Sequence, residues 1–256
     1  MKKITGGIKE FFHEYSVLLR SVPPLMLTLF VLSVVGMNLL ANKSINLPVN
    51  WLALDMGLIL SWLSFLTMDI ITKRLGPRAG IMVSILALAI NLLFVLIFFI
   101  ASIIPGTWSE SYVSGSEKVI NIALDKTFRG TWYVLLGSSI AFAVSAVVNC
   151  LLNFAIGKAF KKHPDSFAAF ALRSYVSTAI AQFIDNLLFA FIVSHVFFGW
   201  TVLQCITCAL TGMVLELLFE VVFSPIGYAS LKKMEKNGTG QEYIDYRNQK
   251  KEGKTA

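Results

Sequence analysis

Six long apolar stretches follow one another along the chain and are separated by short polar segments. They cover residues 21–41, 50–72, 79–104, 131–157, 167–197 and 200–230. Each stretch reaches the length of about 20 residues that an α-helix needs to cross the hydrocarbon core of a bilayer. The pattern predicts an all-α integral membrane protein with six transmembrane helices.

Composition and charge support this interpretation. The chain is 56% hydrophobic and 14% charged, whereas a soluble domain carries about 25% charged residues. Lys and Arg are concentrated in the amino-terminal segment, in the loops after the second and fourth stretches, and in the tail. Because such residues mark cytoplasmic loops, both termini are predicted to be cytoplasmic. The net charge of +7 then reflects topology and attraction to the membrane surface, and no nucleic-acid partner is expected.

The predicted organisation has three parts. Residues 1–20 form a cytoplasmic amphipathic segment on the membrane surface. Residues 21–230 form the six-helix transmembrane domain, in which residues 105–130 connect two helices on the outer side and fit an interfacial lid. Residues 231–256 are polar and glycine-containing, which predicts a disordered cytoplasmic tail. The expected location is the bacterial inner (cytoplasmic) membrane, which the chain crosses several times.

The fifth stretch carries strongly polar residues where hydrocarbon is expected. They are Arg173, Gln182, Asp185 and Asn186. A carboxylate in the middle of a membrane costs about 2.5–3.5 kcal/mol on insertion scales, so it indicates a functional site and requires a partner. That partner is either a substrate or a cation of the protein such as Arg173. Helical spacing places Ser174, Thr178, Gln182, Asp185 and Phe189 on one stripe.

Polar residues of the second and fourth stretches are further candidates. Asp69 and Lys73 are spaced for an i,i+4 ion pair at the inner interface, which leaves a structural and a functional interpretation of Asp69 open. Asp55 is interpreted as an ordinary interfacial charge. Asn149 and Asn153 share a helical face and either pack against a neighbouring helix or line a cavity.

Two glutamates lie one turn apart in the last apolar stretch. Glu216 and Glu220 repel one another in a medium of low dielectric constant, which favours protonation of at least one of them. This arrangement suits coupling of transport to protons. Alternatively, one of the two pairs with Arg173 or Lys73.

The sequence contains no pattern typical of an enzyme or a metal site. Cys205 and Cys208 form a single C-x-x-C without a second pair or a suitably spaced histidine, so we interpret them and Cys150 as residues that pack between helices. There is no metal-ligand cluster, nucleophile elbow or phosphate-binding glycine loop. We therefore expect neither catalysis nor a cofactor.

Several short motifs, in order and with matching spacing, resemble the putative vitamin uptake transporter (VUT) family, also known as queuosine-precursor transporters. The second stretch ends in Asp69-Ile-Ile-Thr-Lys73-Arg-Leu-Gly76. The fourth has Ala141-Phe-Ala-Val-Ser145 followed by Asn149, and the fifth has Ser177-Thr178 followed by Asp185 and Phe189. The sixth has Glu220 followed by Ser224-Pro225. The resemblance covers most of residues 35–230.

The resemblance implies uptake of a 7-deazaguanine such as preQ0 or preQ1, or of queuine. Two departures concern the substrate: Glu216 stands where many relatives carry Lys, and Trp62 where some carry Pro. A purine-like ring fits the candidate residues, because carboxylate and amide groups bind its edge and aromatic rings cover its face.

The prediction is therefore a transporter that imports a small heteroaromatic compound and is coupled to an ion or a proton. An alternative is the substrate-binding membrane subunit of an energy-coupling-factor type vitamin transporter, although Met26–Asn42 lacks the A-x-x-x-A docking motif. A homo-oligomer or energising subunits are possible partners besides lipid. The substrate-binding candidates are Asp185, Gln182, Asn186, Asp69, Asn149, Asn153, Phe189 and Trp62, and the ion-coupling candidates are Glu216 and Glu220.

Overall fold

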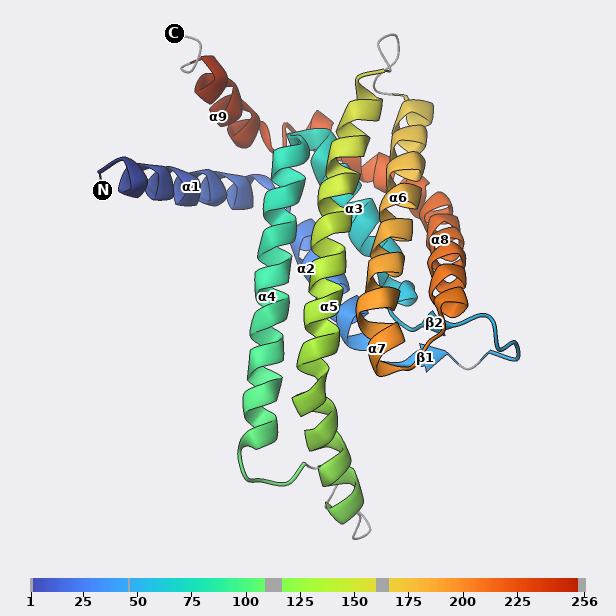
Figure 1. The fold of residues 1–256 in the computed structure, drawn as a ribbon. Helices are drawn as coiled ribbons and strands as arrows, with labels where there is room; N and C mark the ends of the chain where they lie inside the picture. Colours follow the sequence, from blue (N-terminus) through green and yellow to red (C-terminus); the bar gives the residue numbers. More distant parts are fainter. Residues whose placement is uncertain (1, 46, 109–116, 160–165, 253–256) are drawn as a thin grey trace.

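A computed structural model describes residues 2–45, 47–108, 117–159 and 166–252, which are mostly helical (Figure 1). Two residues in each of two strands, β1 and β2, form the sheet found in this part of the chain. The elements are α1 (Lys2–Ser21), α2 (Pro24–Leu40), β1 (Ser44–Ile45), β2 (Leu54–Asp55), α3 (Leu58–Leu75), α4 (Pro77–Ile103), α5 (Glu117–Gly157), α6 (Phe167–Phe189), the π-helical turn η2 (Ala190–Ser194), α7 (His195–Phe197), α8 (Val202–Lys236) and α9 (Gln241–Glu252).

The helices confirm an all-α protein that crosses the membrane several times. Among the described residues, four helical spans are long and apolar enough to cross: α4, α5, α8 and the run from α6 through α7. The bent pair of α1 and α2, whose axes meet at 108°, would make a fifth. α2 alone has 17 residues, or about 26 Å, and α3 carries Asp69, Lys73 and Arg74. As single helices, α2 and α3 therefore do not meet the criteria of length and hydropathy that the four spans meet.

Local sequence signals explain where several helices begin and end. Gly76 separates α3 from α4 and has a φ of 92°, a conformation that glycine adopts without a Cβ clash. Pro77 follows in the first turn of α4, where its missing N–H costs no hydrogen bond. Thr201 and Gln204 form a capping box at the start of α8.

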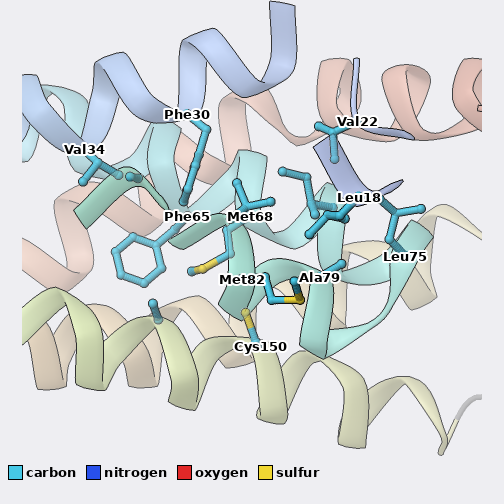
Figure 2. Close-up of a cluster of buried hydrophobic side chains, with 14 of the residues drawn as sticks. Leu18, Val22, Phe30, Val34, Phe65, Met68, Leu75, Ala79, Met82 and Cys150 are labelled. Atoms are coloured by element: carbon cyan, nitrogen blue, oxygen red, sulfur yellow. The ribbon is translucent and has the colours of Figure 1, made fainter. Parts of the chain in front are cut away.

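The helices pack as a bundle in which α5 contacts α4 and α6, and α6 also contacts α8 (Figure 1). A hydrophobic core lies between α2, α3, α4 and α5, with Phe30, Phe65, Met68, Met82 and Cys150 among its buried side chains (Figure 2). The outer surface of α4 is also apolar, because Leu92, Leu93 and Ile97 are exposed there. Such a surface is suited to contact with lipid rather than water.

The outer connection differs from the expected lid over residues 105–130. Residues 109–116 lie outside the described part, but α5 begins at Glu117 and continues without a break to Gly157. Its early turns lie against the end of α4: the rings of Phe98 and Phe128 stack at 4.6 Å, and Arg129 donates to the carbonyl oxygen of Ser102 at 3.0 Å. These contacts extend the α4–α5 hairpin beyond the predicted span.

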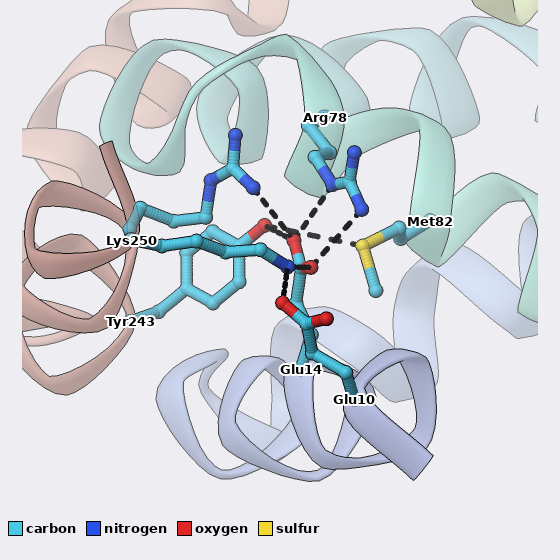
Figure 3. A network of polar contacts seen from close by, with 7 residues as sticks. Glu10, Glu14, Arg78, Met82, Tyr243 and Lys250 are labelled. Carbon is cyan, nitrogen blue, oxygen red and sulfur yellow. Dashed lines mark hydrogen bonds and ion pairs between the residues drawn. The ribbon is translucent and has the colours of Figure 1, made fainter. Parts of the chain in front are cut away.

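The tail also differs from its prediction as disordered. α8 continues to Lys236, and α9 packs against α1. Tyr243, Arg247 and Lys250 lie on one face of α9 by their helical spacing, and all three donate to the buried carboxylate of Glu14 in α1 (Figure 3). Arg78 of α4 donates to both oxygens of the same carboxylate. Charge pairing therefore orders a segment whose composition alone indicates disorder.

Candidate functional site

A cavity lies where α2, α3, α5, α6 and α8 meet the segment around β2. We call it the outer cavity, because it lies away from the end of the bundle that carries α1 and α9 (Figure 1). Its polar lining comprises Asn38, Asp55, Ser61, Ser138, Asp185, Asn186 and Glu216, and the ring of Phe189 adds an aromatic surface. The cavity volume is about 20 Å³, close to the space that one water molecule requires. The cavity is thus narrow, and a ring-shaped ligand requires the surrounding helices to separate.

Neutral groups donate to the carboxylates of this cavity. Asp185 accepts a hydrogen bond from Ser145 of α5 at 2.8 Å. Glu216 accepts from the hydroxyl of Ser61 in α3 and, at 3.2 Å, from the amide of Asn186 in α6. Hydroxyl and amide donors orient a carboxylate but leave its charge uncompensated. The site is therefore suited to a ligand that brings hydrogen-bond donors or positive charge.

The backbone geometry around α6 supports this arrangement. Gly212 of α8 lies so close to α6 that a Cβ at this position would be 2.8 Å from Nδ2 of Asn186. This close approach places Asn186 next to Glu216. The π-helical turn η2 begins directly after Phe189, and such turns occur frequently at functional sites.

An inner cluster lies one to three helical turns closer to the end of the bundle that carries α1 and α9. Asp69 of α3 accepts from Asn149 at 2.5 Å, from Thr178 at 3.4 Å and from Ser174. The hydroxyl of Ser174 also contacts Glu220 of α8. The structure therefore joins Asp69 to Asn149 and to the helix that carries Asp185.

Gln182 lies on α6 between the two groups of residues. Its side chain is fully buried, and neither Nε2 nor Oε1 has a hydrogen-bond partner among the described residues. A buried polar group without a partner costs about 1–3 kcal/mol. A substrate or a water molecule next to Gln182 would supply the hydrogen bonds that its Nε2 and Oε1 atoms lack.

A family model described as putative vitamin uptake transporter matches residues 55–230, which is more than half of the chain. The chain belongs to the vitamin uptake transporter family. Curated proteins and solved structures yield no significant match.

The region shared with the vitamin uptake transporter family includes the carboxylates of both sites. Asp55 is its first residue, and Asp69, Asp185, Glu216 and Glu220 follow within it. α1 and α9 lie outside the matched region. The family match therefore covers the membrane sites, whereas the charge cluster around Glu14 is formed largely by segments that the match leaves out.

The two glutamates of α8 occupy different environments, although the sequence suggests a repelling pair. Glu216 interacts with Ser61 and Asn186 in the outer cavity, and Glu220 interacts with Ser174 in the inner cluster. Their side chains are thus stabilised by separate sets of neighbours. The close carboxyl pairs are formed between helices rather than along α8.

Arg173 is not placed to be the partner of Asp185. It donates to the carbonyl oxygen of Asn153 at 3.1 Å and to Oδ1 of the same residue at 2.8 Å. Arg173 and Asp185 are twelve residues apart on α6, which corresponds to about 18 Å along the axis. Asn153 therefore serves to orient Arg173, and the partner of Asp185 lies elsewhere.

Trp62 lies outside both groups. Its ring stacks on Phe223 at 4.4 Å and on Phe219 at 6.0 Å, and its Nε1 donates to the carbonyl oxygen of Ile59 at 2.8 Å. These contacts place it at the packing surface between α3 and α8. Lys73 likewise lies over the ring of Phe170 at 5.1 Å, while Asp69 faces α5 and α6.

The structure adds residues that were not among the eight substrate-binding candidates. Asp55 borders the outer cavity, and so do Asn38, Ser61 and Ser138. Asp55 follows no helical pattern, because it lies in β2 at the entrance to α3. The sequence feature that could have indicated Asn38, Ser61 and Ser138 is their position, since each is a polar residue within an apolar stretch.

The cysteines and acidic groups give no metal centre within the described residues. Cys205 and Cys208 are both buried and free. Cys205 lies against the carbonyl oxygen of Ala190 at 3.5 Å, as expected for packing between α8 and η2.

Proposed function

We propose that the protein imports a small planar heteroaromatic compound, of the 7-deazaguanine type, across the bacterial cytoplasmic membrane. Membership of a family of putative vitamin uptake transporters supports the general function. The observation that favours this substrate class is the outer cavity, in which Asp185 and Glu216 lie beside amide groups and the ring of Phe189.

The chemistry of such a ring matches the lining. Its ring N–H and amino groups donate to carboxylates, and a hydrogen bond to a charged group contributes about 1.5–3 kcal/mol. Asn186 supplies both a donor and an acceptor for the remaining edge atoms. Phe189 covers one face of the ring, since aromatic faces stack in offset arrangements. The acidic lining also attracts an aminomethyl cation on the substrate.

Transport requires the narrow cavity to open alternately to each side. Ser174, Thr178 and Gln182 follow Asp185 along α6 toward the inner end, so they form a polar path through an otherwise apolar bundle. Gln182 is the first group beyond the cavity and lacks hydrogen-bond partners among the described residues. We propose that Gln182 forms hydrogen bonds with the substrate as the ring of the substrate moves inward.

The proposed topology has six spans with both termini in the cytoplasm. It adds α2 and α3 to the four long apolar spans and places α1 on the inner membrane surface. Reporter fusions after residue 252 and at the α3–α4 turn should report the cytoplasm, and a fusion near residue 114 should report the outside. An external signal from the tail would contradict this orientation.

Uptake by cells that carry this gene alone tests the function. Labelled preQ1 should accumulate in these cells and remain outside cells with the empty vector. Unlabelled preQ1 should compete, and an unrelated vitamin such as riboflavin should not. Accumulation that requires ATP and a second gene product would favour the energy-coupling-factor type subunit. Absence of both uptake and binding would overturn the substrate class.

A further inference from the structure

Two carboxyl groups of the inner cluster meet at one hydroxyl group. Ser174 of α6 contacts Oδ2 of Asp69 from α3 and Oε1 of Glu220 from α8. A serine hydroxyl carries one hydrogen and can both donate and accept. It donates to one carboxyl oxygen, and the other oxygen approaches closely without repulsion only if it carries a hydrogen of its own. One proton shared within this pair therefore accounts for both contacts.

The hydrogen-bond donors identify which carboxyl group is ionised. Asp69 accepts from Asn149 and Thr178 as well as from Ser174, and the guanidinium of Arg173 acts on its charge. Oε2 of Glu220 is buried and has no hydrogen-bond partner among the described residues. Donors and positive charge favour the ionised form of a carboxyl group. The proton therefore belongs to Glu220 in this state.

A second feature of the cluster is a buried acceptor that receives no hydrogen bond from the described residues. Asn149 is fully buried, and its Oδ1 accepts no hydrogen bond from the described residues although its Nδ2 donates to Asp69. Buried acceptors without donors are costly. The cluster is thus arranged to receive a mobile hydrogen.

The charged and titratable groups around the pair come from each of the helices packed against it. α6 contributes Arg173, and α3 contributes Lys73 one turn beyond Asp69. α5 contributes the thiol of Cys150, which receives a hydrogen bond from Thr72. α8 contributes Glu216 one turn outward. Arg173 and Lys73 supply two positive charges, and Asp69, Glu220 and Glu216 supply up to three negative charges, so a single bound proton brings this local group close to neutrality.

We propose that Asp69, Ser174 and Glu220 form a proton-binding site that drives import. In the step we envisage, the O–H bond of Glu220 breaks as its proton moves to Oγ of Ser174, while the hydroxyl hydrogen of Ser174 moves to Oδ2 of Asp69. One proton is transferred between the two carboxyl groups, and Ser174 is regenerated. The coupling part of this proposal rests on the proposed import function. The proton site itself does not depend on a substrate.

This assignment divides the roles of the acidic residues differently from the sequence-based prediction. Asp69 is part of the coupling site rather than of the substrate-binding site. Glu216 faces the outer cavity together with Asp185 and is part of the substrate-binding site. Glu220 keeps its predicted coupling role with a different partner.

Infrared spectroscopy of the purified full-length protein without substrate tests the proton site. At neutral pH a protonated carboxyl group gives a C=O stretching band that Glu220→Gln should lose. Glu216→Gln is the matched control, because it removes an equally buried carboxyl group one turn away and should leave the Glu220 band in place. A folded Glu220→Gln protein with the wild-type band would overturn the proposal.

Ser174→Ala provides a second variant in case Glu220→Gln fails to fold. It leaves both carboxyl groups but removes the hydroxyl between them, so the Glu220 band should shift in frequency. An unshifted band in this variant would contradict the shared proton. Melting temperatures in detergent confirm that each variant is folded.

Transport measurements separate failure of the coupling from failure of the import function. Glu220→Gln should retain exchange of labelled for unlabelled preQ1 but lose accumulation driven by a pH gradient. Accumulation that persists in Glu220→Gln would reject the proton role, whereas loss of preQ1 binding by the wild type would reject only the substrate. Accumulation and a melting temperature that depend on Na⁺ rather than on pH would assign the site to sodium and overturn the proton assignment.

Discussion

Two fully buried glutamates, Glu14 and Glu220, have contrasting environments. Glu14 lies at the α1–α9 end of the protein and accepts from Arg78, Arg247 and Lys250 (Figure 3). Glu220 lies inside the bundle, where it contacts the hydroxyl of Ser174. The first carboxylate is surrounded by an excess of positive charge, while the second shares neutral donors with another carboxyl group.

The difference indicates distinct uses of a buried acid. Burial is the largest single influence on Glu14 and raises its pKa, but hydrogen bonds and charges from Arg78 and Lys250 outweigh it and lower the pKa overall. Such a group stays ionised and fixes structure. A carboxyl group that shares hydroxyl donors with a second carboxyl group can exchange its proton at modest cost, which suits a group that changes state during transport.

Neutralisation of Glu14 should give the largest effect. Glu14→Gln leaves three cations close together around a neutral amide, and breaking a buried ion pair costs about 3–5 kcal/mol. Because Arg78 is half exposed, we expect a loss near the lower end of this range. The melting temperature in detergent measures it, and protease cleavage between α8 and α9 should become faster. Unchanged melting would show that the cluster contributes nothing to stability.

Neutralisation of Asp185 should instead affect binding. Asp185→Asn preserves shape but removes the charged acceptor, so preQ1 affinity should fall by about 1.5–3 kcal/mol. The melting temperature should change little, because the Ser145 hydroxyl can donate to the new amide oxygen. Asp245→Asn, on the exposed part of α9, is the matched control. Normal affinity in folded Asp185→Asn would remove this residue from the site.

The contribution of Glu14 should also depend on pH. Its folded-state pKa is lower than the ordinary value of 4.5, so the stabilisation is complete above about pH 4.5 and is lost as the pH falls through the folded-state pKa. Wild type should therefore lose stability on acidification in this range, and Glu14→Gln should lose less. The stability that the wild type loses through Glu14 on acidification should not exceed the stability that Glu14→Gln removes at neutral pH. Parallel pH curves for the two proteins would contradict the assignment.

The smallest effect is expected for the exposed ion pair that links α1 to α9. Arg20 donates to Glu242 at 3.0 Å, with both side chains more than half exposed. Exposed pairs contribute about 0.2–1 kcal/mol and are weakened by salt. Arg20→Gln should lower the melting temperature only slightly, and less at high salt. A decrease in melting temperature as large as that of Glu14→Gln would show that solvent exposure does not determine how strongly these two ion pairs stabilise the protein.

The sequence predicted much of the membrane bundle because hydrophobic length and periodicity are local properties. The ends of α3 at Leu75 and of α4 at Ile103 lie within a few residues of the expected boundaries at 72 and 104, whereas α3 begins at Leu58 rather than at residue 50. Gly76-Pro77 separates the two helices as expected. The order of α9 was missed because it depends on Glu14, which lies more than 200 residues away in the sequence. Polar composition alone cannot reveal such a distant partner.

The same distinction explains the candidate site. Asp185 and Phe189 were selected as candidates from one stripe of one helix, and Asn186 was selected as the polar neighbour of Asp185 in the sequence. The structure places all three at the outer cavity. The division between Glu216 and Glu220 could not be predicted, because it depends on Ser61 and Ser174 of other helices. Trp62 has the right chemistry for stacking but uses it on Phe223.

The abrupt turn at Gly76-Pro77 has a consequence for how the bundle can move. Arg74, just before the turn, donates to the carbonyl oxygen of Thr239 at 2.8 Å, and Arg78, just after it, is held by Glu14. The inner end of α3 is thereby fixed to the segment that precedes α9, and the inner end of α4 is fixed to α1, so these two ends can act as a pivot. Rocking of the transporter must then displace the inner ends of α5 and α6, so a crosslink between these two helices should arrest transport while one between α3 and α4 should be tolerated.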